Sequence, residues 1–290
     1  LINVFCANLA RSEVVLGATH GSYGIGGLAA PIFATLMVSH GMVWSRFFLI
    51  MIGYKTLNLV FTGWANRGYE SEPTSKFTAS LERIATRQQA EENLSRGKLL
   101  KQVFRNRVTL LGALFIFAYQ GAEVSITGWI ISFLIKDRHG DPSKVGYTSS
   151  GFFAGLTIGR LCLTFFAPRI GIRLYVYILL VIATGLQLLA WLVPSIVGDA
   201  VAVALLGVAF GPIYPCCQAL FSRLLPSRLQ MSSIGFIASA GSSGGAIFPF
   251  VTGLLAQAVG PVSLHPVCLC LYVFMGGCWT LLPPLSRRTE

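Results

Sequence analysis

Apolar residues occur along this chain in long runs that are separated by short polar gaps. Eight of these runs have about 20 residues or more, the length that a helix needs to cross a hydrocarbon core of about 30 Å. Transmembrane β-strands would instead alternate over about ten residues, which these runs do not. The pattern predicts membrane-spanning helices over 14–38, 44–66, 108–135, 147–167, 172–194, 198–221, 231–257 and 264–284.

Two further segments are not full spans. Residues 1–10 are apolar but too short to cross, so we expect them to be the end of a helix that begins outside this sequence. Residues 67–107 are polar and hold nearly half of the charged side chains. One helical face within them carries Leu81, Ile84, Ala85 and Gln88. A surface helix and a solvated linker are therefore both compatible with this segment, and the sequence favours neither.

The composition agrees with a membrane protein. Charged residues make up 11% of the chain, less than half of the roughly 25% found in globular domains, and the mean hydropathy is +0.68. The seven cysteines lie in apolar runs without metal-ligand spacing, so we expect no metal site and no cofactor. The net charge of +11 comes from cations beside the apolar runs, which indicates topology and not nucleic acid as a partner.

The positions of the cations predict the orientation. If 67–107 is cytoplasmic and the spans alternate, sixteen Lys and Arg residues lie inside and only four lie outside. The four outside residues are Arg46, Lys136, Arg138 and Lys144. An excess of Lys and Arg in cytoplasmic loops is the usual bias of polytopic proteins. We therefore expect the segment around Glu82 and the C-terminal Arg287 on the same side.

A short motif recurs in the first and seventh spans. Gly-Gly-Leu-Ala-Ala-Pro, which ends at Pro31, reads like Gly-Gly-Ala-Ile-Phe-Pro, which ends at Pro249. Six spans separate the two motifs, so a parallel repeat about an axis along the membrane normal is expected. The predicted domains are the remainder of an N-terminal bundle over 1–66, a cytoplasmic loop over 67–107, and a six-helix bundle with a short tail over 108–290.

Glu123 lies in the middle of an apolar span, where an ionisable side chain is costly and usually faces a cavity or a partner. Gln120, Glu123 and Thr127 fall within about 60° of one another on a helix, which makes one polar stripe. The stripe predicts hydrogen bonds to a polar solute or the binding of a proton, whereas the alternative is a structural Glu that joins helices.

Lys55 is also mid-span, and a pair with Glu123 is conceivable, although helix pairing or snorkelling suits it better.

The span over 198–221 carries another candidate face, which consists of Gly207, Gly211, Tyr214 and Gln218. Pro212 and Pro215 interrupt this helix, and freed carbonyl groups are tolerated where they line a cavity or where neighbours bond them. The ring and hydroxyl of Tyr214 and the amide of Gln218 suit a sugar. We expect both to line the solute site together with Gln120 and Glu123, and a packing kink is the alternative.

Several segments resemble the major facilitator superfamily. They are Tyr-Gln-Gly-Ala-Glu-Val-Ser-Ile-Thr-Gly-Trp-Ile at 119–130, Gly-Pro-Ile-Tyr-Pro at 211–215 and Gly-Ser-Ser-Gly-Gly at 241–245. These segments are similar to the fucose permease-like group, and above all to its fungal members. The resemblance implies an all-α polytopic transmembrane bundle with an incomplete N-terminal half, alternating access, a sugar substrate and proton coupling. On this basis residues 1–10 belong to helix four and Lys55 to the peripheral helix six.

Two features depart from the family pattern. The loop motif between helices eight and nine normally carries an Asp, whereas Gly159-Arg160 and the segment from Arg169 to Arg173 keep only the glycines and cations. We expect Arg160 and Arg169 to bind helix ends or lipid phosphates, as that motif does in relatives. The coupling carboxylates of the fucose permease lie on helices one and four, at positions that are absent from this sequence. The resemblance therefore assigns proton coupling to no residue of this chain.

Three glycines recur at a fixed spacing in the span over 147–167. Gly151, Gly155 and Gly159 recur every four residues, which predicts a close approach of two helices.

Gly-Ser-Ser-Gly-Gly matches the G-x-S-x-G pattern of serine hydrolases, with Ser243 as nucleophile and His265 as the nearest base. Ser243 lies mid-helix, however, and not on a strand-to-helix turn, so helix packing explains the segment better.

We therefore expect a multi-pass membrane transporter, not an enzyme. Its solute would be a monosaccharide or, as the alternative, another small organic molecule. The lipid bilayer and protons are its other expected partners, and the plasma and vacuolar membranes are not distinguished by these patterns.

Overall fold

The computed structural model describes residues 12–67 and 96–283 of the chain. The helices are α2 (Ser12–Ser39), α3 (Arg46–Asn66), α5 (Arg96–Arg105), α6 (Arg107–Lys136), α7 (Pro142–Val145), α8 (Tyr147–Ile158), α9 (Ala167–Ile170), α10 (Ile172–Leu192), α11 (Ile196–Phe210), α12 (Ile213–Leu224), α13 (Ser227–Val259) and α14 (Leu264–Thr280). Three short turns join some of them, namely η1 (Gly159–Leu163), η2 (Thr164–Phe166) and η3 (Pro261–Ser263).

The predicted all-α bundle is confirmed. Seven helical stretches among the described residues are long and apolar enough to cross a membrane, and Gly24–Ser39 of α2 is a shorter apolar helix. Each predicted span ends within about four residues of an observed helix or run of helices, the accuracy expected of such boundaries. The span predicted over 198–221 consists of two helices, α11 and α12, because Pro212 separates them.

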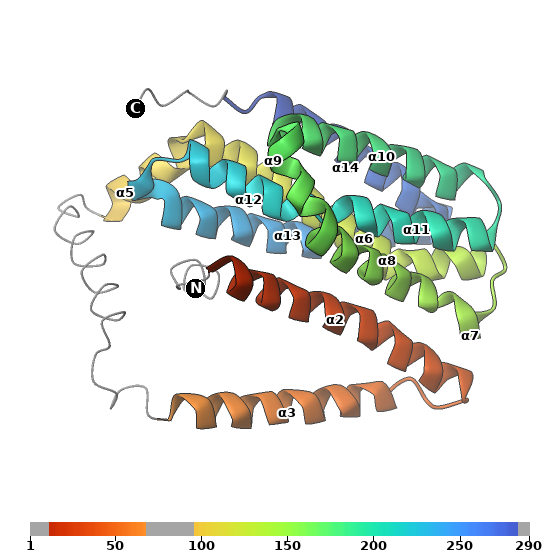
Figure 1. Ribbon diagram of the computed structural model, residues 1–290. Helices are drawn as coiled ribbons and strands as arrows, with labels where there is room; N and C mark the ends of the chain where they lie inside the picture. Colours follow the sequence, from red (N-terminus) through yellow and green to blue (C-terminus); the bar gives the residue numbers. More distant parts are fainter. Residues whose placement is uncertain (1–11, 68–95, 284–290) are drawn as a thin grey trace.

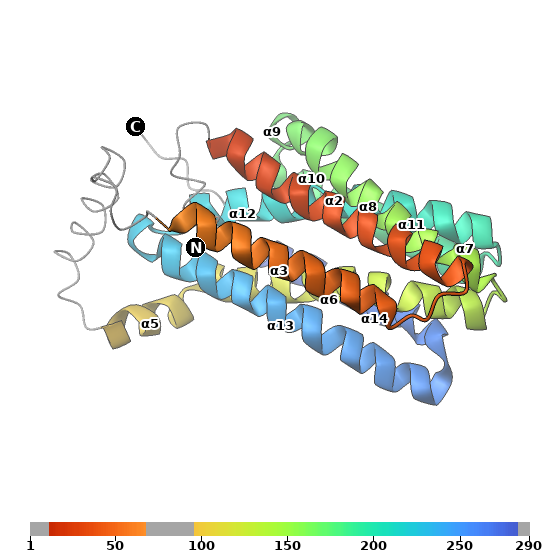
Figure 2. The same ribbon diagram turned by 90° about the horizontal axis from the view of Figure 1, so that it is seen from below.

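The long helices lie side by side and alternate in direction (Figure 1). One end carries α7 and the turns that join α2 to α3 and α10 to α11, and we call it the α7 end. The other carries α5 and α9, and we call it the α5 end. Seen from below, α2 and α3 lie in front of the other helices (Figure 2). The four cations predicted to be outside all lie at the α7 end, and the cytoplasmic position of the α5 end stays a prediction.

α6 is the central helix of the bundle and packs against both α13 and α14. It contributes Phe115 and Tyr119 to the buried core, where Phe115 packs on the ring of Trp279 from α14. α2 lies against α8, whereas the described side chains of α3 are nearly all exposed. Lys55 is among these exposed side chains of α3.

The loop predicted over 67–107 contains a helix that the sequence analysis did not foresee. α5 occupies its last part, and Val103 of α5 is buried. The ring of Phe104 meets that of Phe236 on α13 edge-on, with 4.9 Å between the centroids. The last part of this segment is therefore helical, and an apolar face of α5 packs on the bundle, whereas the cytoplasmic position of the segment stays a prediction. The possible surface helix at 81–88 and the stub at 1–10 lie outside the described residues.

The two copies of the recurrent motif pack on different helices. A Cβ atom on Gly27 would lie 2.5 Å from the ring of Phe153 on α8, whereas one on Gly244 would lie 1.9 Å from the carbonyl oxygen of Phe117 on α6. Pro31 and Pro249 lie inside α2 and α13, and the indole of Trp129 donates a hydrogen bond to the Pro249 carbonyl oxygen at 2.9 Å. The pseudo-symmetry of the two motifs stays a prediction.

Glycines bring α8 and α11 into backbone contact. A Cβ atom on Gly155 would lie 2.1 Å from the carbonyl oxygen of Ala204, and one on Gly159 would lie 2.2 Å from that of Val208. A Cβ atom on Gly207 of α11 would meet the backbone of α8 in the same way, at 2.1 Å. Gly151 makes only ordinary contact, at 3.5 Å from the Cβ of Ala204. The closest approach of the two spans therefore runs from Gly155 to Gly159 on one side and from Ala204 to Val208 on the other.

We expect Gly155→Ala to destabilise the protein, because its new methyl group would collide with backbone atoms that have no rotamer to change. Overpacking of this kind costs about 1–3 kcal/mol. The measurement is the melting temperature of the full-length protein in detergent. Gly185→Ala on α10 is the matched control, since no heavy atom lies within 4 Å of its added methyl. Equal melting temperatures for the two variants would contradict the packing argument.

Candidate functional site

A charged pair lies in the interior of the bundle, between α6 and η1. Oε2 of Glu123 lies 3.9 Å from a terminal guanidinium nitrogen of Arg160, and the two side chains are only 2% and 13% exposed. Charges buried to this degree are stable only when they compensate each other and form further hydrogen bonds. The pair is therefore a costly arrangement, and such arrangements within membranes are typical of solute and proton pathways.

The helices on either side of Arg160 both depart from regular α-geometry. Arg160 lies in η1, a π-helical turn that follows α8, and such turns are frequent at functional sites. Across from it, the chain breaks between α11 and α12 at Gly211 and Pro212. A Cβ atom on Gly211 would lie 2.7 Å from the backbone nitrogen of Arg160, so only glycine permits this approach. Broken helices near the midplane are where many transporters bind their solutes.

Tyr119 joins the charged pair to the break in the tenth span. Its ring stacks on that of Phe210 at 5.2 Å, and its hydroxyl donates a hydrogen bond to the Phe210 carbonyl oxygen at 3.2 Å. The same hydroxyl interacts with the side chains of Glu123 and Arg160. The sequence analysis missed Tyr119, although its place one turn before Glu123 puts it on the same helical face.

Tyr214 and Gln218 extend the polar cluster along α12. The ring of Tyr214 lies 6.0 Å from that of Tyr119. The amide nitrogen of Gln218 donates a hydrogen bond to the Tyr214 hydroxyl at 3.2 Å, whereas its Oε1 atom is buried without a hydrogen-bond partner among the described residues. An amide acceptor in such a position is open to a donor from a bound molecule. We call Tyr119, Glu123, Arg160, Tyr214 and Gln218 the central cluster.

Two predicted site residues do not join the central cluster. The Gln120 side chain lies against α13, with its Cγ 3.2 Å from the position of a Cβ on Gly245. The Thr127 hydroxyl donates a hydrogen bond within its own helix, to the Glu123 carbonyl oxygen at 3.1 Å. The polar stripe of α6 thus has no single neighbour, because Gln120 faces α13 and Glu123 faces η1. That these residues line a solute pathway stays a prediction.

The structure describes the surroundings of two cations that the sequence analysis singled out, Arg160 and Arg169. The structure places Arg160 beside Glu123, and its expected binding to a helix end or a lipid phosphate stays a prediction. Arg160 also takes the place beside Glu123 that Lys55 was considered for. Arg169, in contrast, is exposed on α9, where a lipid headgroup can reach it. Arg160 lies in the π-helical turn η1, which is not visible as a pattern in the sequence.

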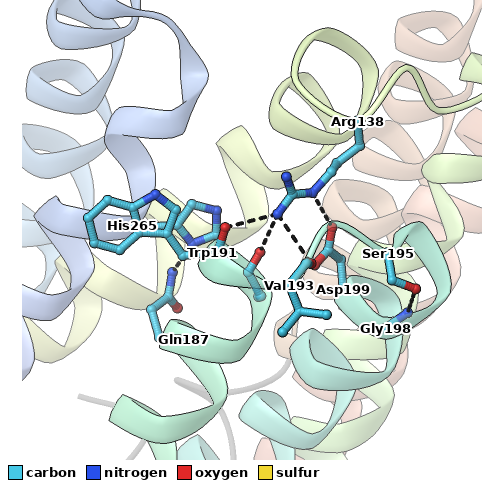
Figure 3. Close-up of polar contacts among 9 residues, drawn as sticks. Arg138, Gln187, Trp191, Val193, Ser195, Gly198, Asp199 and His265 are labelled. Carbon is cyan, nitrogen blue, oxygen red and sulfur yellow. Dashed lines mark hydrogen bonds and ion pairs between the residues drawn. The ribbon is translucent and has the colours of Figure 1, made fainter.

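A second polar cluster lies at the α7 end and is drawn in Figure 3. Nε of Arg138 donates a hydrogen bond to Oδ2 of Asp199 at 3.0 Å, and Asp199 is fully buried at the first turn of α11. A terminal nitrogen of the same guanidinium contacts three carbonyl oxygens that end α10. They belong to Ala190, Trp191 and Val193. Arg138 thus joins the end of α6 to the turn between α10 and α11, and we call this set the Arg138 latch.

His265 lies beside the latch and not beside Ser243. Its Nδ1 atom is 2.8 Å from the amide nitrogen of Gln187, and Gln187 in turn accepts a hydrogen bond from the Tyr272 hydroxyl at 3.1 Å. Figure 3 shows the His265 ring beside Trp191. The hydroxyl of Ser243 is exposed and donates to the Ser239 carbonyl oxygen at 3.1 Å. The two residues therefore do not form the pair that a hydrolase would need.

Comparison with known proteins points to one family. The family model described as "Major Facilitator Superfamily" matches residues 10–249 and 121–290. "Bypass of stop codon protein 6" of Saccharomyces cerevisiae is 26% identical over 97% of this chain and 60% of its own length. "Nitrite extrusion protein" of Bacillus subtilis is 23% identical over 89% of this chain and 62% of its own length.

A third relative, "Gallate transporter" of Pseudomonas putida, is 26% identical over 59% of this chain and 38% of its own length. The chain thus spans less than two thirds of the length of each of these relatives.

Proposed function

The chain belongs to the major facilitator superfamily, and from this premise we propose that it is part of a proton-coupled secondary transporter of a small polar solute. The family and its apolar helices make it a multi-pass membrane protein. The family and the transporter names of two relatives indicate a transporter and not an enzyme. The solute crosses by alternating access, as the fold implies.

The Glu123–Arg160 pair is the observation that carries this proposal. When Glu123 is ionised it holds the guanidinium, which lies 3.9 Å from its Oε2 atom. A proton on Glu123 removes the charge that Arg160 compensates, so the guanidinium becomes available to a second acceptor. Solute binding at Arg160 and proton binding at Glu123 then favour each other, which is the linkage that symport requires.

The chemistry of Arg160 favours a small anion as the solute. A guanidinium presents a planar fork of donors that matches a carboxylate or a similar anion. Gln218 adds an unbonded amide oxygen for a donor group of the solute. The names of two relatives, a nitrite extrusion protein and a gallate transporter, refer to such anions.

A monosaccharide is the second candidate, as the resemblance to the fucose permease-like group suggests. The Tyr214–Gln218 pair favours it, because an aromatic ring beside an amide suits the apolar face and the hydroxyl edge of a sugar. In this case Arg160 would bind hydroxyl groups and Glu123 would remain the proton site.

The test is uptake by the full-length protein in proteoliposomes, with and without an acidic outer buffer. Nitrite, gallate and fucose serve as probes. We expect uptake of an anion that rises with the pH gradient. Arg160→Gln should lower it by at least about tenfold, because a charged hydrogen bond of about 1.5–3 kcal/mol is lost.

Two other outcomes of this experiment are informative. Uptake of fucose that depends on Gln218 but not on the charge of Arg160 would favour the second candidate. Uptake that is equal with and without the pH gradient would contradict proton coupling for either solute.

A further inference from the structure

A groove of about 470 Å³ lies at the α7 end, where α7 and the start of α8 meet α11. Its floor is formed by the small residues Gly151, Ala200 and Ala204, and apolar side chains of α11 form one wall. Asp141, Lys144 and Tyr147 lie at its rim. The groove therefore combines an apolar interior with a charged opening.

The groove opens on the outer surface of the bundle and not toward the central cluster. Val197, Val201 and Leu205 form an exposed stripe of α11. Val197 and Val201 also line the groove. The opposite face of α11 carries the buried Leu206 and Phe210, which belong to the core. An exposed apolar stripe on a spanning helix faces the lipid chains. The apolar interior of the groove therefore lies on the kind of helix surface that meets lipid chains.

The rim holds one charge of each sign. Asp141 caps α7 because its Oδ1 accepts hydrogen bonds from the backbone nitrogen and the hydroxyl of Ser143, at 2.9 and 2.7 Å. These hydrogen bonds lower the pKa of the Asp141 carboxyl, so it is ionised at neutral pH. Its Oδ2 lies 3.8 Å from Nζ of Lys144, and both side chains are largely exposed. An ammonium and a carboxylate oxygen are therefore exposed side by side at the end of the groove.

We propose that this groove binds one phospholipid whose zwitterionic headgroup carries a primary ammonium. The lipid phosphate binds the Lys144 ammonium, the lipid ammonium binds Oδ2 of Asp141, and one acyl chain lies in the cleft between α8 and α11. Tyr147 lies at the rim, and tyrosine is enriched at this depth of the membrane. Because lipid tails are as apolar as the groove itself, its occupancy is decided by the headgroup.

The proposal is independent of the transported solute and is tested by lipid retention. The full-length protein in detergent is incubated with equal amounts of phosphatidylethanolamine, phosphatidylcholine and phosphatidylglycerol of matched chains, and bound lipids are counted by native mass spectrometry. We expect phosphatidylethanolamine to be retained most. Asp141→Asn keeps an N-cap side chain and removes the charge, so it should lower the preference for phosphatidylethanolamine over phosphatidylglycerol by about fivefold, the effect of one ionic contact at a membrane surface.

Two further variants separate the groove from general lipid binding. Val201→Trp fills the groove and should abolish retention of the preferred lipid. Val181→Trp on α10 is the control, since Val181 is also an exposed valine of a spanning helix but lies outside the groove. Equal retention of the three lipids, a preference for phosphatidylglycerol, or equal effects of the two tryptophan variants would overturn the proposal. Gel filtration in detergent checks that each variant stays folded and does not aggregate.

Discussion

Arg160→Gln is expected to lower the free energy of unfolding of the full-length protein by about 3–5 kcal/mol, because it removes the cation beside a buried carboxylate. Glu123 is almost fully buried, so water cannot replace the lost guanidinium. The same variant should lose solute uptake, since the proposed anion site loses its charge. The measurements are the unfolding midpoint in detergent and the uptake rate in proteoliposomes.

The double variant Glu123→Gln with Arg160→Gln sharpens this test. It removes both charges, so most of the lost stability should return while uptake stays absent. Arg169→Gln is the control for loss of a cation near the same end, because Arg169 is exposed on α9. If Arg160→Gln were as stable as Arg169→Gln, the pair would not be the strong interior contact that we describe.

Arg138→Gln is expected to have a comparable effect on stability and little effect on solute affinity. It leaves the fully buried Asp199 without its cation and frees the carbonyl oxygens at the end of α10, at a cost of about 3–5 kcal/mol. The latch belongs to the α7 end, whereas the proposed solute contacts belong to the central cluster. The melting temperature should fall, and the KM of the protein that remains folded should stay unchanged.

The matched control for the latch is Lys136→Gln, a cation of the same helix end that is exposed. Adding Asp199→Asn to Arg138→Gln should restore part of the stability, since the unpaired charge is gone. A melting temperature that does not differ between Arg138→Gln and Lys136→Gln would refute the role of the latch.

The spans were predictable because hydrocarbon imposes a simple rule on sequence. A helix that crosses a membrane bonds its own backbone groups, so length and hydropathy suffice to place it. The partner of Glu123 followed from no such rule. The sequence offered Lys55 as a candidate in mid-span, but the choice of Arg160 depends on a π-helical turn and on the approach of α8 to α11, which are tertiary features.

Part of what was missed did have a signal. Asp199 lies just inside an apolar run, and an ionisable residue there requires a partner, so Arg138 at the same predicted end was a candidate. The roles of two glycines were harder to separate. Gly207 and Gly211 share a face with Tyr214 in the sequence, yet the structure presses them against the backbone of α8. Glycine permits both a solute pathway and close packing, so the pattern alone does not distinguish them.

The most direct test of the account is to compare net uptake and solute exchange in Glu123→Gln at several pH values. Net symport must return an empty, deprotonated carrier, whereas exchange keeps solute bound throughout. Glutamine keeps the size and hydrogen bonds of Glu123 but cannot bind the proton. We predict that the variant, reconstituted at normal levels, exchanges solute at a rate that no longer depends on pH and fails to accumulate solute under a pH gradient. Net uptake that is unchanged from the natural protein at every pH would contradict the claim that Glu123 couples protons to transport.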